Sequence, residues 1–137
     1  MSLRIAAVSL ALVSALAVAA CGGSESESAQ DAEQQVGPAE ARAEIGEVRK
    51  ALDSAVASLR DGDAEAADNA VSEGYLEHFE KVEGPLGKVD AELNEKLEDS
   101  IREELRGTIQ DGGSLAEVTR MVSAIKADLA TAEQKLR

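Results

Sequence analysis

Four stretches of the chain place an apolar residue at every third or fourth position, and short turn-forming sequences separate them. The breaks fall at Asp61-Gly62-Asp63, at Gly84-Pro85-Leu86-Gly87 and at Asp111-Gly112-Gly113. No stretch alternates apolar and polar residues as a half-buried strand does. The helical period predicts amphipathic helices. Four such helices joined by short turns predict an all-α domain over residues 38–137, an antiparallel up-down four-helix bundle.

Residues that favour helix ends stand beside the predicted breaks. Pro38 follows Gly37, as expected at a first helical turn, and Asp61-Gly62-Asp63 ends one helix and caps the next. Asp90 can cap the third helix, and Ser114-Leu-Ala-Glu117 has the form of a capping box before the fourth. The turn chemistry therefore agrees with the apolar pattern.

The first 37 residues read as an export signal and a tether. Arg4 precedes an apolar run from Ile5 to Ala20, and Val18-Ala-Ala-Cys21 has the form of a lipoprotein cleavage site. The run is shorter than the ~20 residues of a transmembrane helix. We therefore predict a bacterial lipoprotein signal peptide at 1–20, lipid attachment at Cys21, and a flexible acidic tether over 21–37. The implied location is the cell envelope, outside the cytoplasm and anchored in a membrane by lipid.

The charge of the chain restricts its partners. There are 14 Lys and Arg residues against 27 Asp and Glu residues, a formal net charge of −13. This balance argues against binding nucleic acid or an anionic lipid surface and permits cations or basic protein surfaces.

The aromatic residues and the only histidine lie within five positions, in the acidic segment from Glu73 to Glu83. Tyr75 and Phe79 fall on the buried stripe when residues are spaced by ~100°. Glu80 and Glu83 fall together on one edge of that stripe, and His78 falls on the opposite edge. A single site on this helix should therefore use either the glutamate pair or His78.

The third predicted helix carries acidic residues on its apolar face. At the same angular spacing Glu98 and Glu104 lie among the leucines and isoleucines of that helix. Because a buried carboxylate is costly unless it is paired, we expect Glu98 to be partly buried with a partner from another helix. The pattern leaves two readings open: an ion-pair network with Arg42 or Arg49, or a carboxylate site for a hard cation.

Residue sets typical of catalysis are missing from the sequence. It has no zinc-type Cys/His cluster, no phosphate-binding glycine loop and no nucleophile–base arrangement. A ferritin-like di-iron centre needs repeated Glu-x-x-His, which one histidine cannot provide. We therefore predict that the protein is not an enzyme.

Residues 66–107 resemble the extracytoplasmic N-terminal helical domain of bacterial oxidase-dependent high-affinity iron permeases. The resemblance rests on a first block, a spacer and a second block, whose residues are Tyr75, Leu76, Phe79, Glu80, Glu83 and Leu86, then Asp90 and Leu93, then Glu98, Leu105 and Arg106. The turn Arg60-Asp-Gly-Asp63 and the last helix are similar too, so that the likeness extends over most of residues 40–136. The permease's membrane helices and Arg-Glu-x-x-Glu motifs are absent.

The resemblance implies a free-standing accessory domain that handles iron outside the membrane and assists a separate iron permease. It singles out Glu80, Glu83 and Glu98 as oxygen ligands for iron, with Glu73 or His78 peripheral. Arg106 belongs to the same pattern and could instead neutralise these glutamates. The alternative function is a helical adaptor that binds no metal and docks its acidic face on a basic envelope partner.

Overall fold

The computed structural model describes residues 36–137, and every regular element in that range is a helix. The first helical rod is α1 (Pro38–Arg60), and the second runs through α2 (Ala64–Glu73), η1 (Gly74–Phe79) and α3 (Glu80–Val89). The third runs through α4 (Ala91–Asp99), η2 (Ser100–Leu105) and α5 (Arg106–Gln110), and the fourth is α6 (Leu115–Lys135). The predicted all-α class is confirmed for this range. The predicted signal peptide and Cys21 lie outside the described residues.

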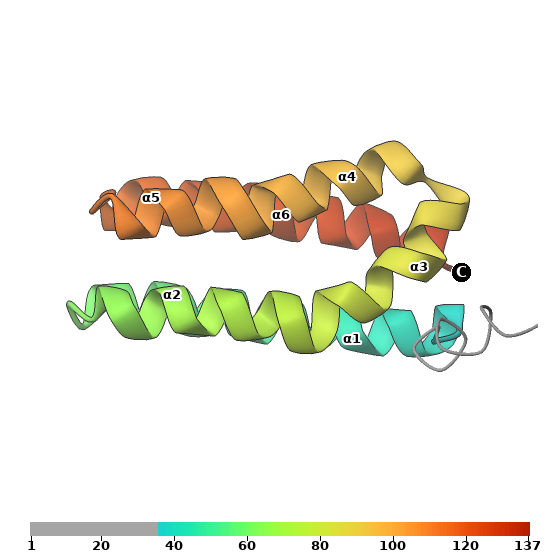
Figure 1. Ribbon diagram of the computed structural model, residues 1–137, viewed down its shortest axis with the longest axis horizontal. Helices are drawn as coiled ribbons and strands as arrows, with labels where there is room; N and C mark the ends of the chain where they lie inside the picture. The colour runs from blue at the N-terminus through green and yellow to red at the C-terminus, as the bar shows by residue number, and fades with distance from the viewer. Residues whose placement is uncertain (1–35) are drawn as a thin grey trace, which may run out of the picture.

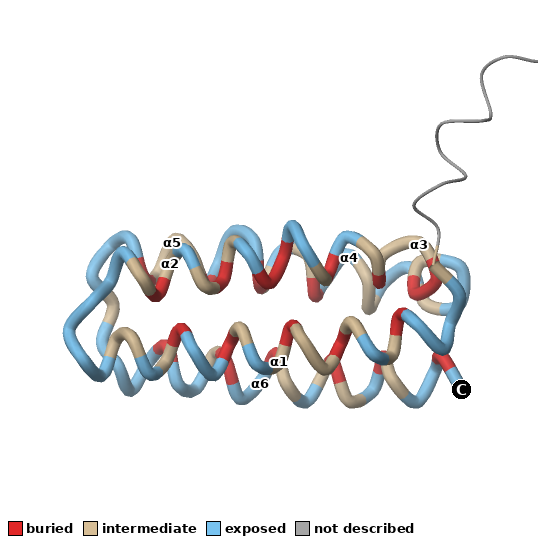
Figure 2. Tube along the Cα trace, turned by 90° about the horizontal axis from the view of Figure 1, so that it is seen from below, coloured by how far each residue is buried: buried red, intermediate tan, exposed pale blue. Residues whose placement is uncertain are grey.

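Neighbouring rods share one core. The first rod packs against α2 and α6, while the third packs against α2 through α5 and against α6 through α4. Figure 1 shows the α1–α2 and α5–α6 turns at one end and the α3–α4 connection at the other, near the C-terminus. In Figure 2 the buried stretches of each rod are turned toward the other rods, and the outer surface is exposed.

The helix ends form as the turn residues predict. Gly62 and Gly112 adopt φ of 85° and 77°, a conformation that only glycine accepts without strain. Three N-caps accept a backbone N–H, at 2.8 Å for Asp63, 3.0 Å for Asp90 and 3.2 Å for Ser114. Each cap satisfies a helix N–H that would otherwise have no partner, which fixes where α2, α4 and α6 begin.

The core is aliphatic except for two rings. Tyr75 and Phe79 are buried with their ring centroids 5.8 Å apart, and the other core residues are Ala, Val, Ile and Leu. Within residues 36–137 no polar or charged side chain other than that of Tyr75 is buried. The stability of the bundle therefore comes from apolar packing, and charged groups act at its edges.

The predicted break at residues 84–87 is wrong, because α3 continues through it to Val89. Pro85 and Leu86 are both buried, so apolar packing offsets the backbone hydrogen bond that a proline removes. In Figure 1 this segment leaves the line of α2 and crosses toward α4. The rod ends instead at Asp90, which caps the next helix.

The predicted position of Glu104 on an apolar face is also wrong. The second and third rods each contain a π-helical turn, η1 and η2, where each turn holds more residues than in an α-helix, so that successive residues are separated by a smaller angle. The residues of η2 therefore depart from the angles that a regular α-helix predicts. Glu104 is exposed and accepts a hydrogen bond from Ser100 Oγ at 3.2 Å.

None of the helices in residues 36–137 combines the length and the apolar character needed to cross a membrane.

Candidate functional site

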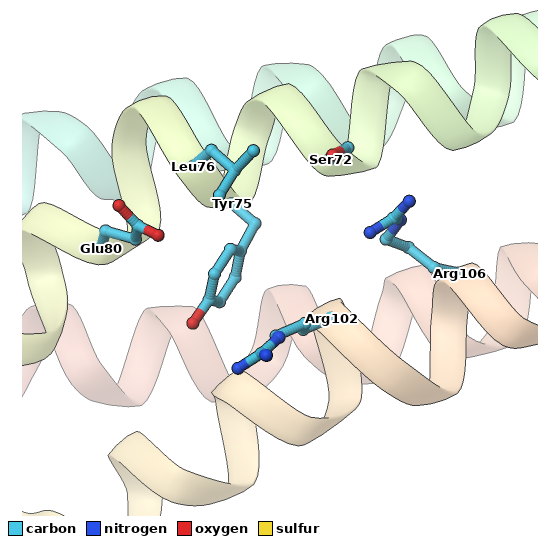
Figure 3. A pocket seen from close by; sticks show the side chains of 6 residues that line it. All are labelled: Ser72, Tyr75, Leu76, Glu80, Arg102 and Arg106. Carbon is cyan, nitrogen blue, oxygen red and sulfur yellow. The ribbon is translucent and has the colours of Figure 1, made fainter.

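The two π-helical turns bring side chains of the second and third rods together at one pocket. This pocket has a volume of about 210 Å³ and is lined by Ser72, Tyr75, Leu76, Glu80, Arg102 and Arg106. Figure 3 shows the Tyr75 ring reaching from the second rod toward Arg102 on the third. The Arg102 guanidinium carbon lies 5.9 Å from the ring centroid, within the range of a cation–π contact.

The Tyr75 hydroxyl connects this pocket to Glu83. It donates a hydrogen bond to Glu83 Oε1 at 2.6 Å, and only 7% of the tyrosine is exposed. Burial is the main cause that raises the pKa of the Tyr75 phenol, and the neighbouring Glu83 and Glu98 carboxylates raise it further. The phenol is therefore neutral at ordinary pH and acts as a hydrogen-bond donor.

Glu83 is a carboxylate whose surroundings raise its pKa. Burial raises its pKa first, and the charges of Glu98 and Glu80 raise it further. The hydrogen bond from Tyr75 and the charge of Arg102 act in the opposite direction. Carboxylates from α3 and α4 thus lie close enough to repel one another, as groups do where they share a site.

Glu98 is partly buried, as predicted, but its partner is not on another helix. Its side chain is 33% exposed and accepts from Arg102 Nη1 at 3.1 Å, an i, i+4 ion pair within the third rod. The prediction of a partner from a different helix is therefore wrong. What Glu98 contributes across the rods is its charge, which raises the pKa values of Glu83 and Tyr75.

The arginines that the sequence suggested as partners for these glutamates are occupied elsewhere. Arg106 forms a two-point ion pair with Asp68 of α2, at 2.8 and 3.1 Å, and its hydrogen bonds are the main cause that lowers the pKa of the Asp68 carboxyl. Arg42 donates to the backbone oxygen of Leu136 at 2.6 Å, and Arg49 pairs with Glu133 at 2.9 Å. The suggested pairing of Arg42 or Arg49 with Glu98 or Glu104 is therefore wrong. Arg106 pairs with Asp68 instead of neutralising Glu80, Glu83 and Glu98.

The two peripheral candidates lie at a different place. His78 Nδ1 is 2.6 Å from Glu44 of α1, and this hydrogen bond is the main cause that lowers the pKa of Glu44. Lys81 also contacts Glu44, at 3.2 Å. Glu73 is exposed, and with His78 it lines a second pocket of about 250 Å³ between α1 and the second rod. Neither residue faces the pocket at Tyr75.

The three glutamates singled out for metal binding are Glu80, Glu83 and Glu98. The charges of Glu80 and Glu98 act on Glu83, but the three carboxylates do not form a preformed metal-binding site. Glu80 is exposed, whereas Glu83 and Glu98 are partly buried. Among residues 36–137 no three His, Cys, Asp or Glu side chains converge closely enough to hold a metal ion. A cation bound here would have to draw the carboxylates together.

Sequence reasoning missed Arg102, Asp68 and Glu44. Arg102 stands four residues after Glu98, a spacing at which helical side chains of opposite charge meet, so this pair was open to prediction. The partners of Arg106 and His78 come from other rods, and only the packing of the bundle brings them together.

Comparison with known proteins adds no relative: no family model, curated protein or solved structure matches this chain. The likeness to the helical domain of iron permeases therefore rests on the residues quoted above.

Proposed function

We propose that the protein binds a hard cation, with iron as the first candidate, and assists a separate membrane iron permease. The ligands would be the carboxylates of Glu83 and Glu98, with Glu80 completing the site from the rim. The observation that carries this proposal is the meeting of the two rods at Tyr75, whose hydroxyl donates to Glu83 at 2.6 Å while its ring lies beside Arg102, the partner of Glu98. Burial first, and then the charge of Glu98, raise the pKa of Glu83. Carboxylates that repel one another are relieved when a cation binds between them.

Carboxylate oxygens suit ferric iron, and calcium and magnesium compete for the same kind of ligand. Glu83 and Glu98 come from different rods, so a cation shared by them would join the second and third rods. Glu80 is exposed and free of helix packing, which allows its side chain to turn toward a cation. Binding should therefore raise the melting temperature, since only the folded chain brings these groups together.

Calorimetric titration of the purified full chain in detergent tests the proposal directly, with ferric nitrilotriacetate, Ca²⁺ and Mg²⁺ as separate titrants. We expect saturable binding of at least one of them, and a loss of that binding in Glu83→Gln and in Glu98→Gln. Glu47→Gln is the matched control, because Glu47 lies on α1 and contacts Lys50. No saturable heat from any titrant, or equal loss in the control, would refute the proposed ligands.

We also infer the order of the four rods in the bundle and the way in which the domain is attached to the membrane. The short turns and the contacts of α1 with α2, of α5 with α2 and of α6 with α1 support an antiparallel up-down order of the four rods. The sequence around Cys21 supports a cleaved signal peptide and a lipid anchor outside the cytoplasm. Together they describe a domain tethered near the membrane, where a permease would be within reach.

A second candidate is a docking module without metal. The observation that favours it is Leu76, which is 55% exposed beside the pocket at Tyr75 and Arg102, an arrangement typical of protein interfaces. The acidic chain would then bind a basic partner. Leu76→Ser separates the two functions, because it should abolish docking on a permease in a binding assay while leaving the cation titration unchanged.

A further inference from the structure

Two arginines line the same pocket, and they are held very differently. Arg106 makes two hydrogen bonds to Asp68, and only 30% of its side chain is exposed. Arg102 makes one hydrogen bond, to Glu98 at 3.1 Å, and 54% of its side chain is exposed. In Figure 3 Arg106 points from the third rod toward the second rod and ends below Ser72, whereas Arg102 extends beneath the Tyr75 ring.

The guanidinium of Arg102 is itself a cation held at the carboxylates. It pairs with Glu98, lies 5.9 Å from the centre of the Tyr75 ring, and its charge acts on Glu83. Arginine does not lose its proton at any ordinary pH, so this cation is always present. The cluster around Tyr75 is therefore a place where the protein already binds positive charge.

We propose that Arg102 is a tethered competitor, which occupies this site when no metal is bound and must leave before an external cation enters. The inference rests on the proposed function and concerns the regulation of the same site. A multivalent cation at Glu83 and Glu98 would repel the guanidinium, which is held by an exposed ion pair with Glu98 and by the face of the Tyr75 ring. Arg106, with its two bonds to Asp68, would stay in place.

The competition sets the concentration at which the site fills. An external cation binds only to the fraction of molecules in which Arg102 has moved away, and the apparent dissociation constant rises in inverse proportion to that fraction. If Arg102 occupies the site about nine-tenths of the time, removing it should tighten binding about tenfold. The protein would then ignore abundant weakly bound cations and respond to those that carry more charge.

The chain contains one tyrosine and no tryptophan, so light absorbed by tyrosine enters at Tyr75 alone. We use Tb³⁺ as the probe, because it is a hard trivalent cation whose emission is sensitised only by a nearby aromatic ring. The purified full chain in detergent is titrated with Tb³⁺ while tyrosine is excited, for the wild type, Arg102→Gln and Arg106→Gln. The last is the matched control, since it removes the same charge from the same pocket.

We expect saturable sensitised emission, with a midpoint about tenfold lower in Arg102→Gln and within about threefold of wild type in Arg106→Gln. Emission only in Arg102→Gln would also support the inference, because the arginine would then block the site completely. An unchanged or higher midpoint in Arg102→Gln would overturn the inference while leaving the proposed function standing. Equal tightening in both variants would also overturn it, because the pocket's overall charge would explain the effect. Absence of emission from all three proteins would remove the proposed function with it.

Discussion

Gly74 of η1 packs closely against Ala51 of α1, and this contact can be tested with a single methyl group. A Cβ atom added at Gly74 would lie 2.6 Å from the Ala51 Cβ, far inside van der Waals contact. Overpacking of this kind costs about 1–3 kcal/mol. The higher helix propensity of alanine returns about 1 kcal/mol. We therefore expect Gly74→Ala to lower the free energy of unfolding by up to about 2 kcal/mol.

A reciprocal substitution separates the clash from other effects. Ala51→Gly alone should cost about 1 kcal/mol through helix propensity. Combined with Gly74→Ala it removes the clash, and the double variant should return to within about 1 kcal/mol of wild type, which gives a coupling energy of about 2 kcal/mol. Gly46→Ala is the control, because no atom lies within 4 Å of its added Cβ. That substitution should stabilise α1 by up to about 1 kcal/mol.

Urea unfolding followed by circular dichroism measures all four variants, and thermal melts should agree at about 4–8 °C per kcal/mol. If Gly74→Ala is as stable as wild type and shows no coupling to Ala51→Gly, the second rod can move away from α1 to accommodate the methyl group without a loss of stability, and the reasoning is wrong.

Three further outcomes follow from charges and from the anchor. The folded-state pKa of Asp68 is lowered mainly by its hydrogen bonds to Arg106, so its stabilising effect exists above the ordinary carboxyl pKa and disappears as pH falls through the lowered value. Asp68→Asn should therefore cost about 1 kcal/mol in urea unfolding at pH 7 and almost nothing near pH 2; an equal loss at both pH values would contradict this. The folded-state pKa of Glu83 is raised mainly by burial, so its ionised form opposes folding as pH rises above the ordinary value. Without added metal, Glu83→Gln should raise the melting temperature at pH 7 and lose that gain near pH 4, and a loss of stability at pH 7 would show that the charged form is preferred. Cys21→Ser should leave the protein unprocessed or released from membranes in a fractionation assay, and an unchanged membrane fraction that still carries lipid would exclude the anchor.

Much of the fold could be read from the sequence, because local chemistry decides it. The apolar spacing of 3.6 residues, the caps at Asp63, Asp90 and Ser114, and the glycine at position 62 each act within a few neighbours. The end of the second rod could not be read in this way. Pro85 usually stops a helix, and only its burial against other rods explains why α3 continues.

The candidate site was open to prediction only in part. Helical angles correctly put Tyr75 and Phe79 in the core, and they separated His78 from the glutamate pair. The helical angles gave the wrong position for Glu104, because no pattern in the local sequence predicts the π-helical turn to which Glu104 belongs. The partners of Arg106 and Glu83 likewise depend on how α2, α3 and α4 meet, which is a property of the packed bundle.

The places where the regular helix fails coincide with the pocket. Tyr75 belongs to η1 and Arg102 to η2, and these two residues meet across the second and third rods. A π-helical turn is less favourable than an α-helical one, and such turns are found frequently at functional sites of proteins. In η2 the wider turn keeps Ile101 and Leu105 in the core while Arg102 stays at the surface beside Tyr75. The same backbone feature that made the angular prediction fail therefore sets the geometry in which Arg102 pairs with Glu98 beside the Tyr75 ring.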